Sequence, residues 1–117
     1  MKMKFTLVTL LPLLAAASAK DIIVSLANDQ SGANAGVEVP ADGAKHHIKS
    51  LWGDTAVAQS GVVKASSAQL TSFETTTVCK ITKPPNVDVT LNARETWASF
   101  DHQKVVELND AVIICHN

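Results

Sequence analysis

Short stretches in which apolar and polar residues alternate constrain this chain more than any other feature of its sequence. Residues 21–26 place Ile22, Val24 and Leu26 at every second position, and residues 87–91 repeat the arrangement with two valines and a leucine. Because successive side chains of a strand point to opposite faces, this period of two predicts strands with one buried face. No stretch has the apolar spacing of an amphipathic helix of four turns, so the pattern favours an all-β protein.

Turn-forming residues divide the rest of the chain into further short segments of the same kind. Strands are expected at 37–39, 47–52, 55–59, 62–65, 73–81, 96–100, 105–108 and 111–115. Residues 66–72 fit either a strand or one helical turn. Tight turns are expected at Ser60-Gly61 and Asn109-Asp110. The number and spacing of these segments predict a small antiparallel β-sandwich or barrel, formed by a single domain.

The first nineteen residues have the composition of a secretory signal peptide. Lys2 and Lys4 precede an uncharged apolar run, and the small residues Ala17-Ser18-Ala19 provide a cleavage site after Ala19. A membrane anchor is the competing interpretation, but a spanning helix needs about 20 apolar residues and this run is shorter. We therefore expect a secreted protein whose single domain covers residues 20–117.

Cleavage after Ala19 leaves 98 residues with a net charge of −3, since eight basic and eleven acidic side chains remain. A weakly acidic domain with scattered lysines is not expected to bind nucleic acid, nor a membrane once the signal is removed. Both cysteines, Cys79 and Cys115, lie in this domain. In an oxidising compartment a single pair predicts one disulfide, which would place the two segments side by side.

Patterns typical of metal or catalytic sites are missing from the sequence. His46, His47, His102 and His116 have no metal-ligand spacing, so no metal and no cofactor are expected. Residues 28–32 carry oxygen-bearing side chains that suit either a calcium loop or an ordinary turn. The carboxylates form no specific pair, and no G-x-S-x-G nucleophile elbow is present. We therefore expect no catalytic residues and no enzyme activity; a small hydrolase or hydrolase inhibitor is a further alternative.

Aromatic residues are scarce, which limits where a ligand could stack. The domain has no tyrosine, and we expect Trp97 and Phe100 to be buried in the core. Trp52 stands next to Gly53 at an expected turn, so its exposure stays open. The candidate binding loops therefore combine Trp52 and Asp54 with Asn28 and Asp29.

The leader, which ends Leu13-Leu14-Ala15-Ala16-Ala17-Ser18-Ala19, and the small, cysteine-poor all-β domain behind it resemble the small secreted proteins of filamentous ascomycete fungi. These include candidate effectors and elicitors of the hypersensitive response of plants. The resemblance covers the layout of the whole chain and rests on no shared motif. It implies a non-catalytic extracellular protein that binds a protein or glycan partner at a host or cell-wall interface. The alternative is a carbohydrate-binding or cell-wall-associated module.

Overall fold

The computed structural model describes residues 21–117 as an all-β domain of ten strands with two short helical segments. The expected signal peptide, residues 1–19, lies outside the described residues. The elements in chain order are β1 (Ile22–Asn28), β2 (Ala33–Val39), β3 (His46–His47), α2 (Ile48–Trp52), η2 (Ala56–Ala58), β4 (Lys64–Ala65), β5 (Ser67–Ser72), β6 (Val78–Lys83), β7 (Val87–Asn92), β8 (Trp97–Ser99), β9 (Val106–Glu107) and β10 (Val112–His116).

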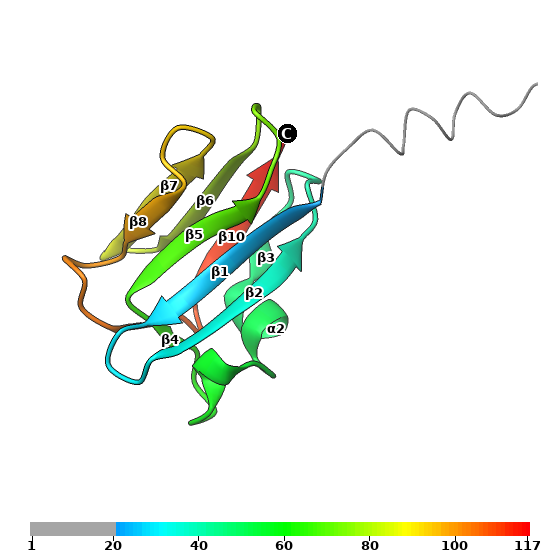
Figure 1. The fold of residues 1–117 in the computed structure, drawn as a ribbon. Helices are drawn as coiled ribbons and strands as arrows, with labels where there is room; N and C mark the ends of the chain where they lie inside the picture. The colour runs from blue at the N-terminus through cyan, green and yellow to red at the C-terminus, as the bar shows by residue number, and fades with distance from the viewer. Residues whose placement is uncertain (1–20) are drawn as a thin grey trace, which may run out of the picture.

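Two antiparallel four-stranded sheets face each other and form a β-sandwich (Figure 1). One sheet has the strand order β2-β1-β5-β8, and the other has the order β3-β10-β6-β7. A two-stranded ladder of β4 and β9 adds a third, smaller sheet. The prediction of an all-β antiparallel fold is confirmed, and the sandwich is the form that it takes.

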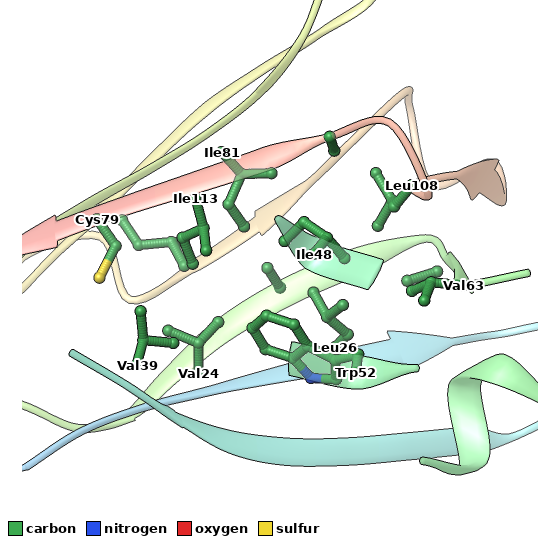
Figure 2. Packing of buried hydrophobic residues seen from close by; sticks show 14 of the residues in the cluster. Val24, Leu26, Val39, Ile48, Trp52, Val63, Cys79, Ile81, Leu108 and Ile113 are labelled. Atoms are coloured by element: carbon green, nitrogen blue, oxygen red, sulfur yellow. The ribbon is translucent and has the colours of Figure 1, made fainter. Parts of the chain in front are cut away.

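The core lies between the two sheets and is built from the alternating apolar residues that the sequence displays. Ile22, Val24 and Leu26 of β1 are buried to 1% exposure or less. Val24 and Leu26 face Cys79, Ile81 and other apolar residues of the second sheet (Figure 2). Complete burial of such a side chain contributes about 1.5–3 kcal/mol to folding, so these alternations account for much of the stability of the sandwich.

One end of the core is closed by the segment between β3 and β4, where the expected strands at 47–52 and 55–59 are wrong. Residues Ile48–Trp52 form the helix α2, and Ala56–Ala58 form a 3-10 turn. Ile48 and Trp52 are both buried, and a separation of four residues puts two side chains on one face in a helix as well as in a strand. Gly53 follows the helix as its C-cap, and the position requires glycine because a Cβ there would collide with the carbonyl oxygen of Lys49. Within residues 21–117, no helix is long and apolar enough to cross a bilayer.

The predicted disulfide between Cys79 and Cys115 is present and lies inside one sheet. The two cysteines are direct partners in the antiparallel pairing of β6 with β10, with a Cα–Cα distance of 4.1 Å. Both side chains point into the core and are fully buried. The bond therefore joins neighbouring strands of the same layer and leaves the contact between the two layers to apolar packing.

Several strand boundaries differ from those expected. The ambiguous segment 66–72 is the strand β5, which lies between β1 and β8. The expected strand 73–81 begins only at Val78, because the Thr77 hydroxyl accepts the N–H of Glu74 and closes a turn instead. A turn is present at each expected position, since Gly61 donates its N–H to the Ala58 carbonyl and Ala111 donates its N–H to the Leu108 carbonyl. Neither turn joins paired strands, because β4 pairs with β9 and β10 pairs with β3 and β6.

Candidate binding surface

The outer face of the β2-β1-β5-β8 sheet carries one row of paired residues that runs across all four strands. Gly36 of β2 pairs with Ser25 of β1, Ser25 pairs with Gln69 of β5, and Gln69 pairs with Trp97 of β8. We call these four residues the Trp97 row. Their neighbours in the strands, such as Val24 and Leu26, point into the core, so the row points outward. At about 4.8 Å between strands, three spacings make the row about 14 Å long.

Trp97 is the exposed end of this row, and the expectation that it is buried is wrong. Its side chain is 48% exposed, and it is the one exposed large hydrophobic residue of the described chain, residues 21–117. Phe100 is buried, as expected. The sequence contained the signal that separates them. Residues three apart in an extended segment point to opposite faces, so the spacing of Trp97 and Phe100 predicts that only one of the two side chains is buried in the core.

The polar groups of the Trp97 row are not used within the described chain. The Ser25 hydroxyl, the Gln69 amide and the Trp97 indole N–H make no hydrogen bond to another side chain or backbone group of residues 21–117. Trp97 and Gln69 are exposed, while Ser25 is half-buried. The row has no ionisable side chain. It therefore offers a flat aromatic face, an amide and a hydroxyl to an uncharged polar ligand.

A second surface feature is a small hollow of about 220 Å³ at the end of the sandwich that carries the β1–β2 loop. It is lined by Asn28 at the end of β1, by Ser31 of that loop, by Lys64, and by η2 with the segment after it, including Gln59 and Ser60. Pockets that hold drug-sized ligands have volumes of about 300–1,000 Å³, so this hollow accommodates only a small group.

The β1–β2 loop owes its shape to internal hydrogen bonds. The Oδ1 atom of Asn28 accepts the backbone N–H groups of Gln30 and Ser31, at 2.9 and 3.2 Å. Gly32 adopts a positive φ of 77° and donates its N–H to the Asn28 carbonyl. The Asp29 N–H donates to the hydroxyl of the buried Ser66. These contacts are those of a turn, the alternative to a calcium loop that the sequence left open.

The structure separates the four residues of the candidate binding loops. Asn28 lines the hollow and Asp29 is exposed beside it, so both remain on the surface. Asp54 is also exposed. Trp52, however, is fully buried, and its indole N–H donates to the Ala35 carbonyl at 3.0 Å. Trp52 is thus a core residue in this structure, and the surface tryptophan of the domain is Trp97.

His46 pairs with a nearby carboxylate. His46 Nε2 lies 3.1 Å from both carboxylate oxygens of Asp42, and Ala44 donates its N–H to Asp42 Oδ1. The backbone hydrogen bond from Ala44, followed by that with His46, holds the pKa of the Asp42 carboxyl below its usual range. Among residues 21–117, no three histidine, cysteine or acidic side chains are grouped so that they could hold a metal ion.

Two carboxyl groups meet beside the start of β1. A hydrogen bond with Asp21, and then the negative charge of Asp21, raise the pKa of Glu38 above its usual range. Glu38 is exposed on β2, two positions from Gly36 and therefore on the same outer face as the Trp97 row. It provides a negative charge beside the row, although none of the four residues of the row is charged.

These features define the class of the protein as a small antiparallel β-sandwich with one intrasheet disulfide and a single exposed tryptophan on a sheet face. No protein-family model, curated protein or solved structure matches the chain.

Proposed function

We propose that this chain is a secreted, non-catalytic protein that acts by binding at a host or cell-wall interface, as a candidate fungal effector or elicitor. The leader sequence and the single cysteine pair support an extracellular location. The disulfide of the folded domain is compatible with that location.

The exposure of Trp97 is the single observation that carries a binding role. Tryptophan buries a large apolar area when it meets a partner, and it is enriched among residues that dominate binding energies. Here it stands on the edge strand β8, in a row whose polar groups have no partner within the described chain. Binding through this face leaves the sandwich core undisturbed.

The experiment applies the purified, disulfide-bonded protein to plant tissue and to isolated fungal cell walls. We expect retention on one of these materials, or a hypersensitive response in the tissue, and we expect Trp97→Ala to reduce either signal. Thr90→Ala is the matched control, because Thr90 is exposed on β7 of the other sheet. A protein that is neither retained nor able to elicit a response would overturn the proposal.

A further inference from the structure

The outer face of the β2-β1-β5-β8 sheet also indicates what kind of molecule it binds. We infer that the Trp97 row is a binding site for a neutral polysaccharide chain, which lies across the strands with one sugar ring stacked on the Trp97 indole. This inference rests on the proposed function and adds the chemical class of the ligand.

The first argument is the chemistry of the row. One face of a sugar ring presents C–H groups, which pack against an aromatic surface, while its hydroxyl groups both donate and accept hydrogen bonds. Trp97 supplies the aromatic surface. Gln69 next to it supplies an amide that donates and accepts, and Ser25 supplies a hydroxyl. None of these groups makes another hydrogen bond within residues 21–117, so a ligand would not have to displace an internal contact.

The second argument is charge. The four residues of the Trp97 row are uncharged, and the nearest ionisable group on the same face of β2 is the acidic Glu38. The domain as a whole has a net charge of −3 after removal of the expected signal. An anionic polymer such as a nucleic acid or a polyuronate would gain nothing from this face, since phosphate and carboxylate binding depends on lysine and arginine. The charges therefore argue against an anionic ligand, and the uncharged residues of the row itself suit a neutral one.

The third argument is shape. Ser25 has a short side chain, and the row rises from it to the indole of Trp97, while at the other end the Ile23 Cγ2 methyl lies against the outer side of Gly36. A stable protein interface buries about 800 Å² on each partner and centres on several aromatic or arginine anchors. This row has one aromatic residue and a length of about 14 Å. A narrow, flat track with a single stacking residue suits an extended glycan better than a protein.

The test is a pull-down of the disulfide-bonded protein on insoluble chitin, cellulose and β-glucan, followed by affinity measurements with soluble oligomers of whichever polymer retains it. We expect retention on at least one of the three. Trp97→Ala should weaken binding at least about tenfold, and Trp97→Phe should restore part of it because the ring is kept. Gln69→Ala should weaken binding less, and Thr90→Ala on the opposite sheet should leave it unchanged.

Absence of retention on all three polymers would overturn the inference, as would retention that Trp97→Ala does not change. Circular dichroism of each variant shows that the sandwich is intact. The two proposals can fail separately. If retention on plant tissue depends on Trp97 while none of the neutral polymers is bound, the glycan is excluded and the proposed function stands with a protein partner.

Discussion

The indole N–H of Trp52 donates a hydrogen bond of 3.0 Å to the backbone carbonyl of Ala35 and so fastens helix α2 to strand β2. Trp52 is fully buried, and this bond satisfies the single polar atom of its side chain. The two tryptophans of the chain therefore have opposite environments, one inside the sandwich and one on its surface.

Substitution of Trp52 is expected to affect stability, whereas substitution of Trp97 is not. Trp52→Phe removes the donor and leaves the Ala35 carbonyl without this partner, which should lower the free energy of unfolding by about 1–3 kcal/mol. Trp97→Phe on the surface should change it by less than about 0.5 kcal/mol. Urea unfolding followed by far-ultraviolet circular dichroism measures both, and equal losses in the two variants would contradict the assignment of Trp52 to the core.

Fluorescence tests the exposure of Trp97 directly. Because the chain has two tryptophans, Trp52→Phe leaves Trp97 as the sole emitter and Trp97→Phe leaves Trp52. We expect red-shifted emission and strong acrylamide quenching when Trp97 is the emitter, and blue-shifted emission with weak quenching when Trp52 is. Weak quenching of Trp97 in the folded protein would show that its ring is covered and would remove the basis for the binding surface.

The disulfide is expected to resist reduction until the domain unfolds. Neither cysteine has exposed area, so a thiol reagent can reach the disulfide only after the sandwich unfolds. Intact mass should rise by two hydrogens only when reductant and denaturant are present together. Because the cysteines are 36 residues apart, the bond restricts the unfolded chain and should add about 4 kcal/mol to the free energy of unfolding. The reduced protein should therefore unfold at a lower urea concentration than the disulfide-bonded protein. Rapid reduction without denaturant would contradict the buried position.

Asp42 should stabilise the folded protein at neutral pH and lose this effect in acid. Its pKa is lowered by the hydrogen bonds from Ala44 and His46, so the folded state favours the charged form. Such a group contributes fully above the unfolded-state pKa of about 3.9, and the contribution disappears as the pH falls through the folded-state value. Asp42→Asn should therefore be less stable than the wild type at neutral pH, and urea midpoints should converge in acid. A difference that does not change with pH would exclude this role of the carboxylate.

Glu38 should show the reverse dependence. The hydrogen bond and the charge of Asp21 raise its pKa, so the folded state favours the protonated form. The ionised carboxylate then opposes folding at neutral pH, and the opposition is relieved as the pH falls through the raised pKa. Glu38→Gln should raise the urea midpoint slightly at neutral pH and lose this advantage in acid. A lower midpoint for the variant at neutral pH would show that the carboxylate makes a favourable contact instead.

The parts of the fold that were predictable from the sequence are those with strong alternation. Ile22, Val24 and Leu26 are buried on one face of β1, and the alternating segment that begins at Val87 is β7. The disulfide followed from the count of cysteines. In each case the sequence pattern fitted only one structure: the alternation fitted a strand, and two cysteines allowed only one disulfide.

The errors arose where a local pattern fitted two structures. Ile48 and Trp52 are four residues apart, which suits one face of a helix and one face of a strand equally. The strand expected at 37–39 extends back to Ala33, because pairing with β1 makes residues 33–36 part of β2 although asparagine and glycine are poor strand formers. The aligned row on the outer face depends on register between strands far apart in the chain, and no local pattern specifies that register.

The position of the disulfide gives the two halves of the domain different freedom. The bond closes a covalent ring from residue 79 to residue 115, and this ring contains β6, β7, β8, β9 and β10. Strands β1, β2 and β5 lie outside it. A force applied to the N-terminus can therefore peel β1 and β2 from the molecule without loading a covalent crosslink, while the ring keeps β8 and its tryptophan tethered to β6 and β10. The sandwich therefore has a C-terminal part that is closed by a covalent crosslink and an N-terminal part that is held by hydrogen bonds and apolar packing alone.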